Sequence, residues 1–208
     1  MASNEMLARW FDNDSMVAGG YALKPWGAED YWDWVASWSV SLELPSDLGY
    51  PDDGYVLPPL NVHEHIVHVE HEATNGMLFG GNALSATTMH KAKRKSTDER
   101  AAKVAELVAA EPNEPWIVWC DTNYEADALR EAMPSAIEIR GSDKTESKES
   151  RLQAFTRGDI KHLVTKPDIA GFGLNWQHCA RAAFVGLGYS YERWYQAICR
   201  NHRFGQTR

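Results

Sequence analysis

The stretch Pro115-Trp-Ile-Val-Trp-Cys120 is an unbroken apolar run after a proline-rich break, and Asp121-Thr122-Asn123 follows it directly. A short apolar run bounded by turn residues is typical of a strand that is buried on both faces of a parallel sheet. The polar tripeptide supplies a turn and a helix N-cap, and residues 124–133 continue with a helical pattern. The order of strand, turn and helix predicts the opening unit of an α/β domain.

The same alternation of apolar runs and helical patterns continues through the rest of the chain. Strands that alternate with helices pair in parallel and are covered by helices on both faces. We therefore predict an α/β fold with its core in residues 115–208, and ligands at the carboxyl ends of the strands. The other predicted strands cover 136–142 and 182–188, and one more begins at Leu163. The other predicted helices cover 101–110, 147–157 and 190–199.

A glycine-bearing loop follows the strand that begins at Leu163, and it reads Gly171-Phe-Gly173-Leu-Asn175-Trp-Gln177. Glycine adopts a positive φ without steric cost and lets the backbone approach a ligand closely. Many loops contain two such glycines, but this loop lies directly after a predicted buried strand. Its position predicts contact with a ligand at the carboxyl end of the sheet.

The last thirteen residues read Gln196-Ala-Ile-Cys-Arg200-Asn-His-Arg203-Phe-Gly-Gln206-Thr-Arg208. Three residues are nearly one helical turn, so Arg200 and Arg203 are predicted to project from the same helix face. Guanidinium groups match the geometry of phosphate oxygens. The pair therefore predicts a site at which one phosphate group meets two arginines.

Two of these segments resemble motifs of the Swi/Snf-like branch of superfamily 2 helicases. The pattern QxxxRxxRxGQ at 196–206 is similar to motif VI, and GxGLNxQ at 171–177 is similar to motif V. The resemblance extends over about residues 20–208 and implies the C-terminal RecA-like lobe of a phage or bacterial enzyme. The chain departs from the common pattern at residues 167–169 and at Cys199, where smaller residues are usual.

The resemblance also implies roles for individual residues around ATP and Mg²⁺, in a DNA-dependent helicase or translocase. Arg203 is the expected arginine finger, Arg200 shares its phosphate, and Gln196 positions the nucleotide or water. The other expected sites are ATP binding by Gly171, Gly173, Asn175 and Gln206, and DNA binding by Arg140, Gly141, Ser142 and Lys166.

A complete motor of this kind needs a first RecA-like lobe with a GxxxxGK[ST] phosphate loop and an acidic magnesium motif. The sequence contains neither. We therefore expect the chain to act with an N-terminal ATPase lobe, in cis or in trans, and to be inactive alone. The alternative is a noncatalytic adaptor lobe that binds DNA or protein.

Residues 1–60 differ in character from residues 61–208, which form the predicted lobe. They hold ten acidic residues against Arg9 and Lys24, and so account for the net charge of −8 of the whole chain. Residues 31–38 predict an aromatic helix. We predict a mainly helical, tryptophan-rich insertion or linker that packs on the lobe, or that docks the first lobe or another protein. Its charge disfavours direct DNA binding.

Four histidines, three in the predicted strand over 62–69 and His71 just after it, suggest a metal site. His63, His65 and His71 would share one face of a strand, and His68 would face the other way. The cysteines stand singly and show no zinc-ligand spacing. A structural role for the histidines is favoured, and no metal site is predicted.

The basic stretch over residues 90–103 predicts either a solvated helix face or a nucleic-acid contact. The sequence has no signal peptide, no apolar run long enough to span a membrane and no lipidation motif. Unpaired cysteines fit a reducing compartment. We expect a cytoplasmic protein of a bacterial or phage-infected cell.

Overall fold

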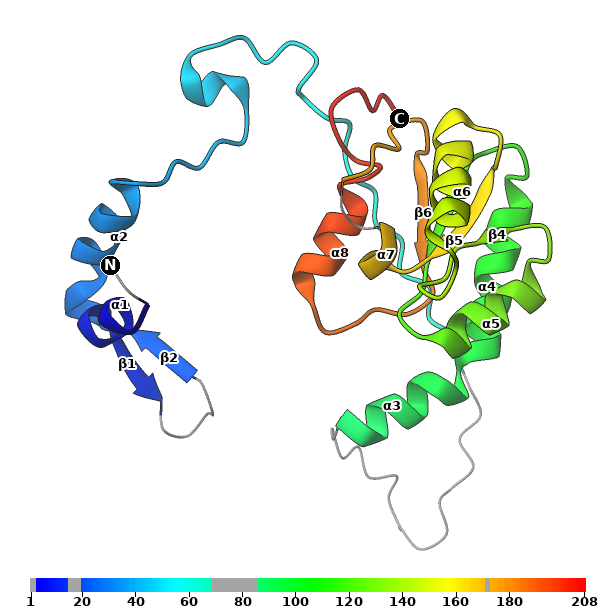
Figure 1. Cartoon of the computed structure of the whole chain (residues 1–208), viewed down its shortest axis with the longest axis horizontal. Helices are drawn as coiled ribbons and strands as arrows, with labels where there is room; N and C mark the ends of the chain where they lie inside the picture. The colour runs from blue at the N-terminus through cyan, green and yellow to red at the C-terminus, as the bar shows by residue number, and fades with distance from the viewer. Residues whose placement is uncertain (1–2, 15–19, 69–85, 171–172) are drawn as a thin grey trace, which may run out of the picture. The chain divides into compact units, whose positions relative to one another are not determined.

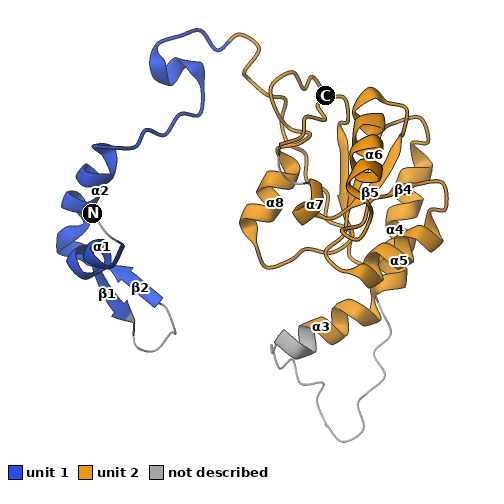
Figure 2. Ribbon diagram, in the orientation of Figure 1, with its two compact units in different colours: residues 1–52 blue, residues 53–208 orange. Residues whose placement is uncertain are grey.

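The computed structural model describes residues 3–14, 20–68, 86–170 and 173–208 (Figure 1). The chain divides into two compact units, residues 1–52 and residues 53–208 (Figure 2). The second unit carries every residue to which the sequence assigns a binding or catalytic role.

The first unit is built around an aromatic cluster. Trp10 is its buried centre, stacked on Trp34 with ring centroids 4.9 Å apart and edge-on to Tyr31 at 5.6 Å. The predicted aromatic helix is present, although Trp38 lies beyond its end. The antiparallel hairpin was not predicted. The elements are α1 (Ser3–Trp10), β1 (Phe11–Asp14), β2 (Gly20–Leu23), η1 (Pro25–Gly27), α2 (Ala28–Ala36) and η2 (Pro45–Leu48).

The second unit is a four-stranded parallel sheet with helices on both faces, in the strand order β4-β5-β3-β6 (Figure 1). This architecture confirms the predicted RecA-like α/β fold. The elements are α3 (Ala86–Lys95), α4 (Thr97–Ala110), β3 (Trp116–Trp119), α5 (Asn123–Ala132), β4 (Ile137–Glu138), α6 (Thr145–Arg157), β5 (His162–Thr165), α7 (Pro167–Ala170), β6 (Arg181–Phe184) and α8 (Tyr191–Ile198).

Successive residues of β3 point to opposite faces of the sheet, and each set belongs to a different hydrophobic core. Trp116 and Val118 pack with residues of α4 and α5. Ile117 and Trp119 pack on the other face with residues of α6, α7 and α8. All four residues of the strand are buried, which explains why its sequence is continuously apolar.

Local capping explains where several helices begin and end. The Thr122 side chain accepts a hydrogen bond from the Glu125 N–H, and the Glu125 carboxylate accepts one from the Thr122 N–H, which together form a capping box. Ser190 caps α8 by accepting from the Arg193 N–H. Helix α6 closes on Gly158, whose φ of 82° is the left-handed conformation that glycine tolerates best.

Some predicted elements differ from the structure. No strand is present in residues 62–68, so the strand predicted over 62–69 is wrong for the described part of that segment. The helix predicted over 101–110 begins earlier, at Thr97. The strand predicted over 136–142 is paired only at Ile137 and Glu138, and one turn of helix, α7, separates β5 from the glycine loop.

None of the helices that the structure describes is both long enough and apolar enough to cross a membrane.

Candidate functional site

Because the strands are parallel, the segments that follow them meet at one edge of the sheet. Asp121 and its neighbours follow β3, Arg140 closely follows β4, and Lys166 follows β5 directly. This carboxyl edge therefore gathers residues from distant parts of the sequence.

The structure brings the two predicted arginines together, although not on a helix. Helix α8 ends at Ile198, so Arg200 and Arg203 lie in the turns beyond it. Nη1 of Arg200 and Nη1 of Arg203 donate to the same carbonyl oxygen, that of Leu174, at 3.1 and 3.0 Å. Neither guanidinium has a carboxylate partner within the described residues. Two positive charges thus share one neutral acceptor.

Arg200 is the more firmly held of the two. Its Nε donates to the Gln196 carbonyl at 3.0 Å, and its Nη2 donates to the Gln196 side-chain oxygen at 3.1 Å. Arg200 as a whole is 9% exposed. Burial, and then the neighbouring charge of Arg203, lower the pKa of Arg200 below its ordinary value. Arg203 is only half-buried, and is the more accessible of the pair.

The described part of the glycine loop, residues 173–177, is joined through its backbone to residues 199–205, which we call the arginine turn. The Trp176 N–H donates to the Arg200 carbonyl at 2.8 Å, while Leu174 accepts from both arginines. Gly173 has a φ of 73° and is exposed, as the predicted close approach to a ligand requires. Asn175 is also exposed, and its side chain accepts weakly from the Gln177 N–H at 3.4 Å. Gly171, also predicted to bind ATP, lies outside the described residues.

Gln206, predicted to bind ATP, is buried and fully engaged with the backbone. Its Nε2 lies within hydrogen-bonding distance of the Cys179 and Asn201 carbonyls, and its Oε1 accepts from two successive N–H groups, those of Thr207 and Arg208. These bonds fix the turn that follows Arg203. The observed geometry therefore favours a structural role for Gln206 over contact with a nucleotide.

The predicted DNA-binding residues Arg140, Gly141, Ser142 and Lys166 line one cavity of about 290 Å³, which Asn123 also lines. Lys166 Nζ donates to the Asn123 side-chain oxygen at 2.8 Å and has no carboxylate partner among the described residues. Arg140 is paired with Asp127 and Glu138, which raise its pKa. Lys166 is therefore the cation of this cavity whose charge is left uncompensated.

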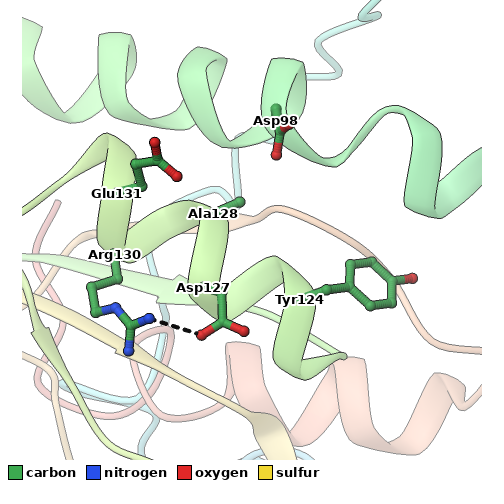
Figure 3. Close-up of a pocket in the computed structure, with 6 residues that line it drawn as sticks. All are labelled: Asp98, Tyr124, Asp127, Ala128, Arg130 and Glu131. Atoms are coloured by element: carbon green, nitrogen blue, oxygen red, sulfur yellow. Dashed lines mark hydrogen bonds and ion pairs between the residues drawn. The ribbon is translucent and has the colours of Figure 1, made fainter.

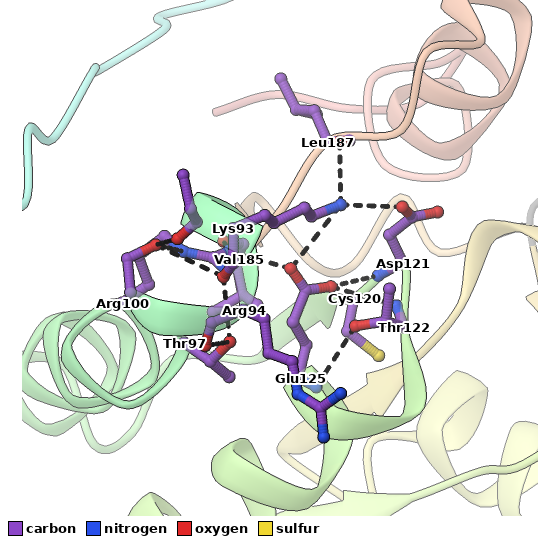
Figure 4. A network of polar contacts seen from close by, with 12 residues as sticks. Lys93, Arg94, Thr97, Arg100, Cys120, Asp121, Thr122, Glu125, Val185 and Leu187 are labelled. Atoms are coloured by element: carbon purple, nitrogen blue, oxygen red, sulfur yellow. Dashed lines mark hydrogen bonds and ion pairs between the residues drawn. The ribbon is translucent and has the colours of Figure 1, made fainter. Parts of the chain in front are cut away.

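A buried ion network at the same edge was not predicted from the sequence (Figure 4). Glu125 is fully buried, and its Oε1 accepts from Arg100 at 2.9 Å while Lys93 lies 3.7 Å away. Lys93 Nζ also donates to Asp121 at 2.8 Å and to the Leu187 carbonyl at 3.0 Å. Helices α3 and α4 are thereby tied to the ends of β3 and β6.

Two cations of the basic stretch over 90–103 belong to this network, because Lys93 and Arg100 point toward Glu125 and pair with it. The other basic side chains of the stretch include Lys91, Arg94 and Lys95, which are exposed, so a solvated helix face and a nucleic-acid contact both stay predictions for them. The sequence contained one signal for Glu125, namely its position three residues after Thr122 in a capping box. Nothing local indicated that two cations from another helix pair would meet it.

A separate hollow of about 310 Å³ lies between α4 and α5 (Figure 3). Three carboxylates, those of Asp98, Asp127 and Glu131, line it with Arg130, which pairs with Asp127 at 3.1 Å. The excess of negative charge disfavours phosphate. None of the predicted site residues lines this hollow.

The histidine segment is only partly described. His63, His65 and His68 lie in residues without helix or strand, and His71 lies outside the described residues. Within the described residues, no three His, Cys, Asp or Glu side chains form a group that could hold a metal ion.

The parallel sheet, the covering helices and the loops at its carboxyl edge define this unit as a RecA-like lobe. The family model of the helicase conserved C-terminal domain matches residues 99–205. The chain belongs to that family, which confirms the helicase part of the predicted resemblance.

Three solved structures are similar to this chain over about half of its length. The C-terminal part of the Fun30 ATPase domain is 18% identical over 55% of this chain and 38% of its own, with a TM-score of 0.47. The C-terminal domain of the DEAD-box protein Dbp5 is 18% identical over 52% of this chain and 65% of its own, with a TM-score of 0.45. T4 UvsW is 12% identical over 58% and 26%, with a TM-score of 0.47.

The chain thus spans less than two thirds of each of these three proteins. Among curated proteins, no sequence matches it.

Proposed function

We propose that this chain contributes the second motor lobe of a DNA-dependent ATPase, a helicase or translocase of the Swi/Snf-like branch. ATP with Mg²⁺ would lie between this lobe and a first RecA-like lobe, and when bound it supplies the phosphoryl group for transfer to water. Arg203 and Arg200 would stabilise negative charge on the γ-phosphate. The single observation that carries the proposal is the convergence of both guanidiniums on the Leu174 carbonyl.

Electrostatics favours an anion at this place. Two neighbouring guanidiniums repel each other, and burial adds a desolvation cost, as the lowered pKa of Arg200 indicates. The oxygens that accept from the two guanidiniums, those of Leu174 and Gln196, are all neutral and compensate these charges poorly, whereas a phosphate oxygen would compensate them well. Gln196 holds Arg200 in its present orientation through two hydrogen bonds, so its proposed contribution is to pre-organise the site.

The proposed coupling between DNA and ATP runs through the glycine loop. Leu174 lies between the exposed positions Gly173 and Asn175, and it accepts hydrogen bonds from both arginines. A strand of DNA that displaced this loop would therefore alter the position of the arginines directly. The residues that line the cavity around Lys166, at the end of β5, would contact the DNA backbone.

The test is ATP hydrolysis by the purified chain, with and without DNA, alone and mixed with a first lobe that carries the phosphate loop. We expect turnover only in the mixture, with DNA stimulating it. DNA binding without turnover in any combination would contradict the motor proposal and favour the adaptor alternative.

We expect Lys166→Ala to weaken DNA binding and to lower the slope of log affinity against log salt by about one, because one phosphate contact is lost. Lys161→Ala is the matched control. Lys161 directly precedes β5 at its other end and is exposed. Fluorescence anisotropy with a single-stranded oligonucleotide at several salt concentrations measures both slopes. Equal losses of DNA affinity in the two variants would contradict the proposed contact between Lys166 and the DNA backbone.

The same experiments with a matched RNA oligonucleotide would test the proposed preference for DNA. A phage or bacterial origin and a cytoplasmic location, where ATP and DNA are both present, belong to the same proposal.

A further inference from the structure

A segment far from the arginine turn in the sequence packs directly on it. Residues 54–58, which we call the strap, contain no helix or strand and begin two residues after the first unit ends. The ring of Tyr55 lies 4.8 Å from that of Phe204, measured between centroids, at an interplanar angle of 34°. The carbonyl oxygen of Pro58 lies 2.8 Å from His202 Nε2. Because a carbonyl only accepts, the imidazole must donate this hydrogen bond.

These two contacts fall on the two residues that flank Arg203. His202 precedes it and Phe204 follows it, so the strap holds the backbone on both sides of the arginine. Gly54 has a φ of 79°, and a Cβ there would lie 3.5 Å from the Phe204 ring, so the strap runs close along the aromatic face.

The other bonds of the arginine turn restrain its backbone more than the Arg203 side chain: the His202 N–H donates to the Ile198 carbonyl, and the Gln206 side chain fixes the residues after Arg203. The Arg203 side chain donates to the Leu174 carbonyl, and its own carbonyl accepts from the Gln206 N–H at 2.9 Å. Arg200, by contrast, is fixed by three side-chain hydrogen bonds and by burial. The orientation of Arg203 therefore depends on what holds its neighbours.

We propose that the strap is a positioning element for Arg203. The positioning residues are Tyr55, which lies in the strap, and His202, which lies in the arginine turn and bonds the strap at Pro58. The strap keeps the guanidinium on the Leu174 carbonyl, where it is pre-organised for an anion. The catalytic meaning of this arrangement rests on the proposed function, whereas the geometric claim does not.

The geometric claim is tested by chemical modification of the purified chain with phenylglyoxal, followed by mass mapping of each arginine. Tyr55→Ala should raise the modification rate of Arg203 by roughly two- to tenfold, the range that corresponds to the loss of one aromatic pair. Tyr55→Phe should react at the wild-type rate, since the ring contact needs no hydroxyl. Arg157, which is exposed and paired with Asp159, is the internal control.

A second variant removes the other contact of the strap, the hydrogen bond between His202 and the Pro58 carbonyl. His202→Leu removes the hydrogen bond to Pro58 and should raise the Arg203 rate in the same way, and it carries the test if Tyr55→Ala does not fold. An Arg203 rate that is unchanged in the folded variants, or raised equally in Tyr55→Phe, would overturn the proposal.

The catalytic consequence is measured in a motor completed with a first lobe. Tyr55→Ala should lower kcat severalfold at an unchanged KM for ATP, and Tyr55→Phe should restore it. An unchanged kcat despite faster modification would show that the strap does not position Arg203 for catalysis. A wild-type motor without turnover would count against the proposed function alone, because the modification experiment needs no ATP hydrolysis.

Discussion

Arg203→Ala should lower the rate of ATP hydrolysis by about 10³-fold or more in a motor completed with a first lobe, which is the lower end of the range for arginine fingers. The physical reason is that the guanidinium would stabilise charge that develops only as the phosphoryl group is transferred. Arg203→Lys should recover little, since an ammonium group lacks the planar fork. Turnover is measured as phosphate release at saturating ATP and DNA.

Folding must stay intact for this result to be meaningful, and the structure predicts that it does. Arg203 is half-buried and makes one side-chain hydrogen bond, so its loss should leave the melting temperature almost unchanged. Arg200→Ala should differ, because the buried Arg200 also holds Gln196 and the glycine loop. Arg157→Ala, on an exposed ion pair at the end of α6, is the control. Normal turnover by Arg203→Ala would sink the assignment of this residue as the finger.

Glu125→Ala should destabilise the second unit by about 3 kcal/mol or more, the cost of removing one partner from a buried ion pair. The variant leaves Arg100 without its carboxylate and Lys93 with Asp121 alone, and it also leaves two backbone N–H groups at the start of α5 without their acceptor. Urea unfolding, followed by circular dichroism, measures the change.

The matched control is Glu106→Ala, which breaks the exposed pair between Lys103 and Glu106 on α4. An exposed pair of this kind contributes at most about 1 kcal/mol. Equal losses in the two variants would mean that the network around Glu125 does not stabilise the fold.

The contribution of Glu125 should also depend on pH. Burial by itself raises the pKa of this carboxyl. Hydrogen bonds from the Asp121 N–H, the Arg100 side chain and the Thr122 N–H, together with the charge of Lys93, outweigh burial and hold the pKa below its ordinary value. A carboxyl with a lowered pKa in the folded chain stabilises the fold above its unfolded pKa of about 4.3, and loses this effect as the pH falls. The difference in unfolding free energy between wild type and Glu125→Gln should therefore shrink below about pH 4.

Gly186 offers an independent test of how closely this network is packed. A Cβ at Gly186 would lie 2.7 Å from Lys93 Cε and in steric conflict with the Glu125 carboxylate. Gly186→Ala should thus destabilise the unit by displacing Glu125 or Lys93, although it removes no charged group. A wild-type unfolding midpoint in this variant would contradict the packing described.

The elements that were predicted well are those whose signal is local. Strand β3 is apolar throughout because both of its faces are buried, and the end of α6 is marked by Gly158. The strand predicted over 62–69 was wrong for residues 62–68 because β-branched residues such as Val62, Ile66 and Val67 favour a strand only where another strand is available for pairing.

The sequence predicted that the two arginines of the candidate site lie together, but it placed them on one helix face, and the structure does not. Arg200 and Arg203 do converge, but beyond the end of α8, where helical spacing no longer applies. Their common acceptor belongs to the glycine loop, more than twenty residues earlier in the sequence. Gln206 matched the same pattern, yet its amide is used within the turn.

The sequence by itself determined the α/β class, the alternation of the main strands and helices over residues 115–208, and the presence of paired arginines and a glycine loop. Periodicity and capping act over a few residues, so they can be recognised without a structure. Only the tertiary structure decided that Lys93 and Arg100 turn inward to Glu125, and that Tyr55 packs on Phe204. These contacts join segments that lie far apart along the chain, and their geometry depends on how the whole sheet and its helices pack.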